Sequence, residues 1–487
     1  MAAGQGAGLS AAARRCCNCH DMANIRESTR VDAAHMAFNA WSQIPMVAEH
    51  QRCHHMEILA ARPPQTMTEK ILARACGRSF VQPGDEIEAR PDFVISYDFP
   101  GYTDVFFRET REELGVEKVS KPERFVLFID HMVPAATPKE EELHKVTRAW
   151  GAAQGVPVHE RKGIGHQVSA EMGYATPGAF IVHFDGHVSQ LGALGAYAFG
   201  ARKGVLEAYA STTMAIAVPP TVKIIITGSL QPGVMARDVF HHLVRVMGPA
   251  SCAFKAVELA GPVIDAMSIE GRQTVCGQAM FLGANTMLIA PDAKTLAYMQ
   301  GRAKLDLAPV YPDADAVYER VVTVDVSALE PIVVVPPSPA NTRNLTDYLG
   351  LEVHTGYLGS CASGRLEDLR AAADVLRGRQ VKPGFQLHVV PTSQAIMAQA
   401  AREGLIACLV EAGAFISSPT CDYCYGRIAT MADGQRAVST GTLNTPGRMG
   451  SVDSEIYICN AAVVAASAIE GRIADPRPYL AAAVALS

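Results

Sequence analysis

Short runs of β-branched residues alternate with helical stretches from about residue 66 almost to the end of the chain. The expected strands cover residues 124–129, 179–183, 222–226, 332–335 and 386–390. The expected helices, whose apolar residues recur at helical spacing, cover residues 139–154, 235–247, 365–377, 394–412 and 460–473. This alternation is typical of α/β folds, because each helix carries the chain back to begin another parallel strand.

The length of the chain indicates several subdomains, since 487 residues exceed the size at which one hydrophobic core keeps growing. Composition shifts near residues 215–221 and in the proline-rich stretch 326–342 provide two boundaries. The expected α/β subdomains, with mainly parallel sheets, cover residues 66–220, 221–328 and 329–487. Residues 1–65 lack sustained periodicity, and we expect an irregular N-terminal extension there.

The extension is rich in residues that can bind zinc. These residues are Cys16, Cys17, Cys19, His20, Cys53, His54 and His55. Their spacing matches no standard zinc finger, so an irregular extension and a zinc site are both open interpretations. The segment Thr66-Met67-Thr68-Glu69 has the pattern of a helix start and marks the expected beginning of the first subdomain.

The composition excludes several classes of function. The net charge is -6 and no basic stripe is present, which argues against nucleic acid as a partner. The longest apolar runs have the length of strands and are too short to cross a membrane. Twelve cysteines in 487 residues are too sparse for a disulfide scaffold. We therefore expect a soluble protein of the reducing cytoplasm.

Polar residues gather where the expected strands end. Asp130-His131 follows one strand, Asp185-Gly186-His187 follows another, and Gly359-Ser360-Cys361 follows the apolar stretch before residue 359. In open α/β sheets the crevice beyond the carboxyl ends of the strands is where ligands bind. The sequence therefore predicts one composite site.

A C-x-x-C pair, Cys421 and Cys424, lies between Pro419 and Gly426. Taken alone, such a pair is a redox dithiol, half of a zinc site or two core cysteines. A thioredoxin-like pair would stand at a helix start after the first strands, and a zinc site would have two further ligands at short spacing. Neither condition is met, and Cys361, at a strand end before a helix, is the third candidate ligand.

The chain resembles the aconitase superfamily, and within it the large subunit of 3-isopropylmalate dehydratase. The resemblance covers residues 66–475 and rests on the order and spacing of several motifs, namely Asp130-His131, Gly163-Ile164-Gly165-His166, Asp185-Gly186-His187, Gly359-Ser360-Cys361, Leu366-Glu367-Asp368-Leu369 and Cys421/Cys424. It implies an aconitase-like fold and a [4Fe-4S] cluster held by Cys361, Cys421 and Cys424. One iron without a protein ligand would then serve as a Lewis acid.

The resemblance also assigns the acid–base residues. Dehydration beside a carboxylate needs one group to remove a carbon-bound proton and another to protonate the departing hydroxyl. The implied catalytic residues are Asp130, His131, His166, Asp185 and His187. Arg448 matches a family arginine that binds a substrate carboxylate. The alternatives are structural histidines at strand ends and a surface loop arginine.

Several positions depart from the family pattern on the face of the expected site. Gly277 and Phe281 stand where family members have asparagine and glutamate, Gly186 replaces a serine, Ala362-Ser363 replaces Thr-Asn, and Leu443 replaces an arginine. Either the pocket accepts a less polar substrate, or catalysis has weakened and the cluster serves another purpose.

The implied function is an iron–sulfur hydro-lyase acting on a hydroxylated di- or tricarboxylic acid of the 3-isopropylmalate, homoaconitate or dimethylmalate type. The chain ends near residue 487 without a swivelling domain like that of single-chain aconitases, so a separate small subunit is the expected partner. The alternative is a cluster-bearing regulatory or RNA-binding homologue with weakened catalysis.

Overall fold

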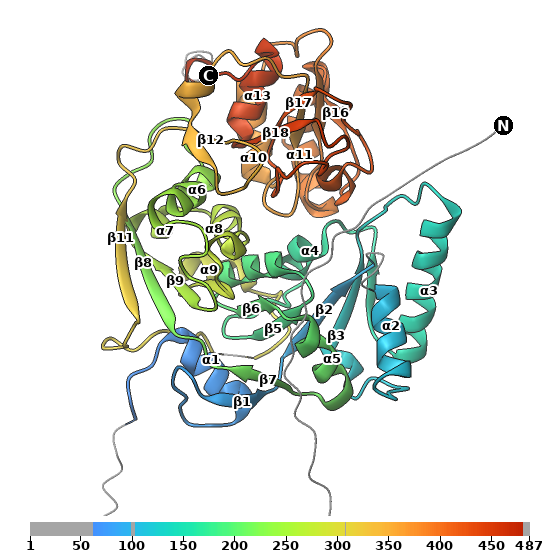
Figure 1. Cartoon of the computed structure of the whole chain (residues 1–487), viewed down its shortest axis with the longest axis vertical. Coiled ribbons are helices and arrows are strands. Elements are labelled where there is room, and N and C mark those ends of the chain that lie inside the picture. Colours follow the sequence, from blue (N-terminus) through green and yellow to red (C-terminus); the bar gives the residue numbers. More distant parts are fainter. Residues whose placement is uncertain (1–61, 99–102, 307, 481–487) are drawn as a thin grey trace, which may run out of the picture. The chain divides into compact units, whose positions relative to one another are not determined.

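The computed structural model describes residues 62–98, 103–306 and 308–480. Residues 1–61 of the expected N-terminal extension lie outside these ranges, and so do the cysteines and histidines for which zinc binding is an open interpretation. Within the described part, no helix is both long and apolar enough to span a membrane. Three larger, mainly parallel sheets and one two-stranded sheet organise this part of the chain (Figure 1).

The first larger sheet has the strand order β4-β3-β2-β5-β6, and all its neighbouring strands are parallel. Its strands are β2 (Phe93–Tyr97), β3 (Phe125–Ile129), β4 (Val158–Glu160), β5 (Phe180–His183) and β6 (Tyr197–Gly200). Its helices are α2 (Thr103–Glu112), η1 (Pro122–Arg124), α3 (Pro138–Gln154), α4 (Gly165–Glu171), η2 (Gly186–Leu194) and α5 (Arg202–Ser211). Every residue of β2, β3 and β5 is buried, as expected where helices cover both faces of a parallel sheet.

The second larger sheet has the order β10-β9-β8-β11 and is entirely parallel. Its strands are β8 (Thr221–Thr227), β9 (Ala256–Ala260), β10 (Thr286–Ile289) and β11 (Arg320–Asp325). Its helices are α6 (Ala236–Met247), α7 (Pro262–Ala266), α8 (Ile269–Cys276), η3 (Ala279–Leu282) and α9 (Ala293–Met299).

The third larger sheet has the order β13-β12-β18-β17-β14-β15-β16, in which β12 pairs antiparallel with both β13 and β18. Its strands are β12 (Ile332–Val334), β13 (Thr342–Asn344), β14 (Thr355–Leu358), β15 (Gln386–Val389), β16 (Phe415–Ile416), β17 (Arg436–Ser439) and β18 (Glu455–Ile458). Its helices are η4 (Leu345–Tyr348), α10 (Leu366–Leu376), α11 (Gln394–Arg402), α12 (Leu405–Glu411), η5 (Asp422–Tyr425) and α13 (Ala461–Glu470).

The smallest sheet pairs β1 (Glu86–Ala89) with β7 (Met214–Ala217) in antiparallel register. The preceding helix, α1 (Met67–Cys76), begins at Thr66, whose side chain accepts a hydrogen bond from the backbone N–H of Glu69 while the Glu69 carboxylate accepts from the backbone N–H of Thr66. This reciprocal cap confirms the predicted helix start.

The sequence predictions are confirmed for the α/β class, and each larger sheet falls inside one predicted range. The exact boundaries between subdomains stay a prediction. One predicted helix is wrong: residues 394–412 form α11 and α12 rather than a single helix. Gly404, with a φ of 75°, separates them, because this left-handed conformation ends a helix at little cost for glycine.

Candidate active site

A pocket of about 160 Å³ collects side chains from the first and third sheets. It is lined by Tyr97, His131, His166, Asp185, His187, Cys361, Cys421, Cys424, Tyr425, Thr442 and Arg448. These residues include every predicted site residue except Asp130. Asp130 does not line the pocket, but its carboxylate is hydrogen-bonded to the ring of His131. Most of the lining residues follow the carboxyl ends of strands, so the expected composite site is present. The catalytic, ligand and substrate-binding roles of these residues stay predictions.

His131 is tied to the carboxylate beside it in sequence. Its Nδ1 lies 2.6 Å from Oδ1 of Asp130, whose other oxygen accepts from the backbone N–H of Gly165 at 2.7 Å. Burial alone would lower the pKa of His131, but the Asp130 carboxylate, together with the Cys421 thiol, raises it well above its usual value. His131 therefore favours the protonated form.

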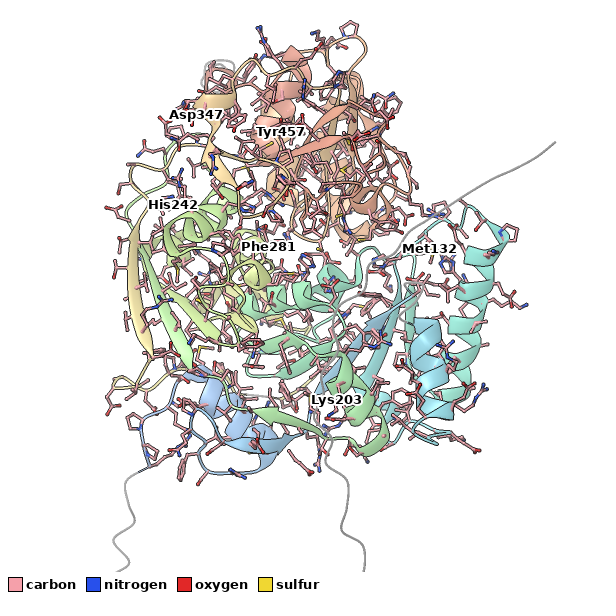
Figure 2. The ribbon with its side chains drawn as sticks, viewed as in Figure 1. Met132, Lys203, His242, Phe281, Asp347 and Tyr457 are labelled. Carbon is pink, nitrogen blue, oxygen red and sulfur yellow. The ribbon has the colours of Figure 1, made fainter. Side chains whose placement is uncertain are left out.

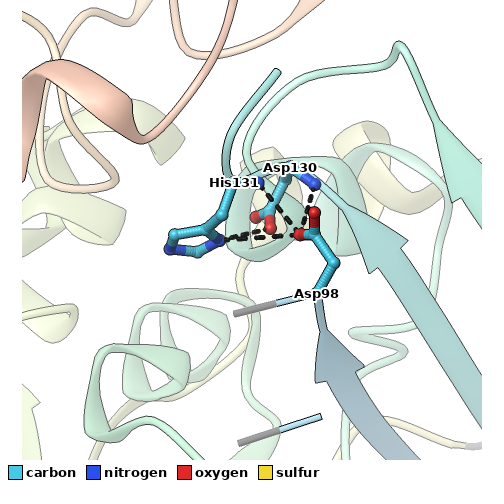
Figure 3. A group of neighbouring side chains, drawn as sticks. All are labelled: Asp98, Asp130 and His131. Carbon is cyan, nitrogen blue, oxygen red and sulfur yellow. Dashed lines mark hydrogen bonds and ion pairs between the residues drawn. The ribbon is translucent and has the colours of Figure 1, made fainter. Parts of the chain in front are cut away.

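A second carboxylate, Asp98, supports this pair from the end of β2. Figure 3 shows the Asp98 and Asp130 carboxylates on the same side of His131, and Oδ1 of Asp98 accepts the backbone N–H groups of both residues at 3.0 Å. Its Oδ2 lies 2.8 Å from Nε2 of His144 on α3. The ligand atoms of Asp98, Asp130 and His131 lie within 4.8 Å of one another, and these mutual hydrogen bonds account for that closeness.

Tyr97 and Asp98 also belong to the site but were not predicted from the sequence. The Tyr97 hydroxyl donates to Oδ2 of Asp185 at 3.4 Å, and its ring lies 4.8 Å from the ring of His131. Both residues stand at the carboxyl end of β2, as Asp130 does for β3. The same strand-end signal would have found them had residues 93–97 been identified as a strand.

Asp185 and His187 form the second acid–imidazole pair. Oδ1 of Asp185 accepts the backbone N–H of His187 at 2.7 Å and lies 2.9 Å from its Nδ1. Burial works to lower the pKa of His187, and the Asp185 carboxylate outweighs it, so the pKa is raised. His166 differs, because burial dominates and lowers its pKa, which keeps it neutral.

Two of these histidines each have one buried ring nitrogen that is not hydrogen-bonded to any described residue. The Nε2 atoms of His166 and His187 are buried and have no hydrogen-bond partner within the described part of the chain. A buried polar atom without a partner is costly. Both residues line the pocket, so these atoms indicate that a polar ligand belongs there.

The C-x-x-C segment is fastened to the Asp130-His131 loop. The backbone N–H of Cys421 donates to the carbonyl of Asp130 at 3.2 Å, and the Asp422 carboxylate accepts the backbone N–H of Met132 at 2.7 Å. These contacts place the two segments side by side, although about 290 residues separate them in the sequence.

The donor set fits an iron–sulfur cluster. Cys361, Cys421 and Cys424 are free thiols that line one pocket, and burial together with the charges of the other two thiols raises the pKa of Cys361 well above its usual value. Three cysteine sulfurs that line one pocket suit a polynuclear iron–sulfur cluster, whose ligands are cysteine thiolates.

Arg448 lies beside the third of these cysteines. Its Nε donates to the carbonyl of Cys424 at 2.9 Å, and its Nη2 is 3.6 Å from the Cys424 sulfur. Burial raises the pKa of the Cys424 thiol, but the guanidinium outweighs this and lowers it. The arginine therefore stabilises a thiolate here and also lines the pocket.

Two of the positions that depart from the family pattern can be placed relative to the site. The Phe281 ring, labelled in Figure 2, lies 6.3 Å from the His187 ring in an edge-on arrangement. Leu443 is half-buried and is not among the residues that line the pocket.

Comparison with known proteins agrees with this geometry. The sequence model of the aconitase family (aconitate hydratase) matches residues 70–350 and 344–471. The 3-isopropylmalate dehydratase large subunit 1 of Methanopyrus kandleri is 40% identical over 420 residues, covering 85% of this chain and 100% of that protein. The 3-isopropylmalate dehydratase large subunit of Halothermothrix orenii is 38% identical, covering 85% of this chain and 99% of that protein. The chain therefore belongs to the aconitase family.

Proposed function

We propose that this chain is the cluster-binding large subunit of a hydro-lyase that reversibly dehydrates a hydroxylated di- or tricarboxylic acid of the 3-isopropylmalate, homoaconitate or dimethylmalate type. The observation that carries the proposal is the convergence of three thiols, three histidines and one arginine on a single pocket. The names of the relatives support the reaction class.

Cys361, Cys421 and Cys424 would hold a [4Fe-4S] cluster. When bound, the cluster supplies a Lewis acid that polarises the hydroxyl and a carboxylate of the substrate. The Asp130–Cys421 and Asp422–Met132 hydrogen bonds fix the C-x-x-C segment before any ligand binds.

The histidines supply the proton of the leaving group. His187 has its Nδ1 directed to the Asp185 carboxylate, so its Nε2 is the atom that carries a proton toward the pocket. His131 is held in the same way by Asp130. A protonated imidazole at either position can protonate the departing hydroxyl, while the neutral His166 accepts a hydrogen bond from the substrate.

Arg448 provides the carboxylate contact, because a guanidinium binds a carboxylate through two parallel hydrogen bonds. The relatives are named as large subunits, and the partner in this proposal is a separate small subunit. That subunit is the expected source of the base that removes the carbon-bound proton. We propose that the complex works in the cytoplasm, where thiols stay reduced.

Anaerobic reconstitution with iron and sulfide tests the proposal. The expected result is about four iron atoms per chain, with sulfide-to-iron charge-transfer absorbance, and dehydration of one of the three named acids when a small subunit is added. A protein that retains no iron under these conditions, or that retains it after all three cysteines are replaced with alanine, would refute the cluster assignment. Iron without turnover of any hydroxy acid would refute the hydro-lyase.

A further inference from the structure

The loop that carries Cys361 has a conformation that it would not keep by itself. Ser360 has a φ of 86°, in the left-handed region that non-glycine residues avoid. Its hydroxyl donates to the carbonyl of Thr440 at 3.0 Å and accepts the backbone N–H of Ala362 at 3.2 Å. Surrounding structure must therefore hold this loop.

Arg365 is one of the groups that hold it. This side chain is completely buried, and its Nη2 donates to the carbonyl of Cys361 at 2.7 Å. The remaining donors reach three other elements. They bond to Gln167 of α4 at 2.9 Å, Thr274 of α8 at 2.9 Å and Gln190 of η2 at 2.5 Å. The guanidinium thus fixes the Cys361 carbonyl relative to both the first and the second sheets.

Arg237, in the first turn of α6, holds the next carbonyl. It is 3% exposed, and its Nη2 donates to the carbonyls of Ala362 at 3.3 Å and Thr440 at 2.5 Å. Its Nη1 donates to the carbonyl of Gly441 at 3.0 Å. Arg365 at the start of α10 and Arg237 on α6 therefore bind the carbonyls of two consecutive residues, Cys361 and Ala362.

Both cations are buried without a direct counter-ion. Within the described residues, no carboxylate oxygen lies within 4.0 Å of either guanidinium, and Asp238 and Asp368 act on Arg237 only from beyond that distance. A buried charge is costly unless an opposite charge is near. Asp368 is the charged group that acts most strongly on Arg237, followed by Cys459 and Asp238, and the Asp368 carboxylate is itself stabilised by both Arg365 and Arg237.

We infer that Arg237 and Arg365 are positioning residues for Cys361. They hold the carbonyls of Cys361 and Ala362, and so direct the Cys361 sulfur into the pocket before any cluster binds. They also place positive charge beside the anionic group that the three cysteines would carry. The inference rests on the proposed function only for the identity of that group.

Alkylation of the apo-protein tests the positioning separately from the cluster. In Arg365→Gln, the rate at which iodoacetamide modifies Cys361, followed by mass spectrometry, is expected to rise about tenfold, because loss of a buried charged hydrogen bond frees the loop. The rates at Cys421 and Cys424 are expected to change less than about twofold. Arg370→Gln is the matched control, since Arg370 lies on the same helix but is half exposed and pairs with Glu403 on the surface.

Two conservative variants separate charge from shape. Arg365→Lys and Arg237→Lys keep the positive charge but lose the planar fork, so Cys361 is expected to be alkylated at a rate between those of wild type and Arg365→Gln. They also keep the test open if Arg365→Gln does not fold. An unchanged Cys361 rate in all three variants would overturn the inference, as would an equal rise at all three cysteines, which indicates general loosening.

A second measurement uses the reconstituted protein. Iron release to a chelator is expected to be about tenfold faster in Arg365→Gln than in wild type or Arg370→Gln. If wild type takes up no iron, the proposed function fails while the alkylation result still decides the role of the two arginines. If iron release and Cys361 alkylation are both unchanged, the arginines are packing residues only.

Discussion

Replacing Arg427 with glutamine should loosen the contact between the two loops that form one wall of the pocket. Arg427 Nη1 lies 2.6 Å from Oδ2 of Asp422, and its Nε and Nη2 reach the Glu140 carboxylate at 2.9 and 2.5 Å. Asp422 in turn accepts the backbone N–H of Met132. One guanidinium therefore joins the C-x-x-C segment to the start of α3.

The expected cost comes mainly from Asp422, whose side chain is 0% exposed. Removing one partner of a buried ion pair typically costs about 3–5 kcal/mol, because the other charge stays buried. Asp422 keeps two hydrogen bonds at 2.7 Å, from Met132 and from the Tyr425 hydroxyl, which places the loss at the lower end. The contact with the partly exposed Glu140 adds about 0–1 kcal/mol, so the total is about 3 kcal/mol.

Hydrogen exchange measures this loss where it occurs. A local destabilisation of about 3 kcal/mol raises the exchange rate of the Met132 amide about a hundredfold, because that amide donates to Asp422. Arg436→Gln is the control, since it breaks an exposed pair with Glu455 and is expected to cost no more than about 1 kcal/mol. If peptides spanning residue 132 exchange no faster in Arg427→Gln than in this control, the reasoning is wrong.

Three further predictions follow from the same geometry. Cys421→Ala should lower the iron content of the reconstituted protein at least about tenfold while Cys408→Ala, on α12 outside the pocket, leaves it unchanged, and equal iron in both variants would count against the ligand assignment. His187→Gln should lower kcat by about 10²–10⁴-fold with an unchanged circular dichroism spectrum, and a kcat within about threefold of wild type would remove His187 from the acid–base role. The hydrogen bond from Arg427 lowers the pKa of Glu140 from 4.5 to about 2, so the stability that this carboxylate contributes is present above about pH 4.5 and is lost as the pH falls through about 2. The difference in urea midpoint between wild type and Glu140→Gln should therefore be constant at neutral pH and close between about pH 4.5 and 2, and a difference that persists at pH 2 would contradict the sign.

Local sequence patterns were sufficient for much of the fold. The β-branched run that predicted residues 222–226 forms the interior of β8, and the predicted helix 139–154 is α3 with one further residue, Pro138, at its start. Residues 394–412 failed because the apolar spacing continues across Gly404, whose backbone leaves the helical region. A periodic pattern records which residues face the core, and it does not record the conformation of each backbone position.

Strand ends alone identified only those site residues that follow recognised strands, whereas His166, Cys421, Cys424 and Arg448 were predicted from the resemblance to the family. Asp130 and Asp185 follow such strands, but Asp98 depends on β2 lying between β3 and β5, a pairing that no local pattern states. The burial of Arg365 is even harder to predict from the sequence. Its hydrogen-bond partners lie up to 198 positions away, and a charged residue is normally expected on the surface.

The Gly277 position shows how one departure from the family pattern is accommodated. A Cβ added at Gly277 would lie 3.0 Å from both the Cβ of Gln190 and the carbonyl oxygen of Gln273. A larger side chain would therefore displace Gln190, whose amide oxygen accepts a hydrogen bond from Arg365. Glycine at position 277 therefore leaves the room that the Gln190 side chain needs to bond to Arg365.

Gly186 and Phe281 differ from that case, and the difference bears on whether the pocket has been remade. A Cβ at Gly186 would meet Met280 at 3.5 Å, which is an ordinary contact, so packing does not require glycine there. Phe281, next to Met280, packs its ring between those of His187 and Phe240, at 6.3 Å from each. An eroding site would leave unfilled space or unpaired charge near His187, the proposed acid. Here an aromatic side chain packs against that histidine from outside the pocket lining, and on this contact we propose a pocket reshaped for a less polar substrate rather than one that has lost its reaction.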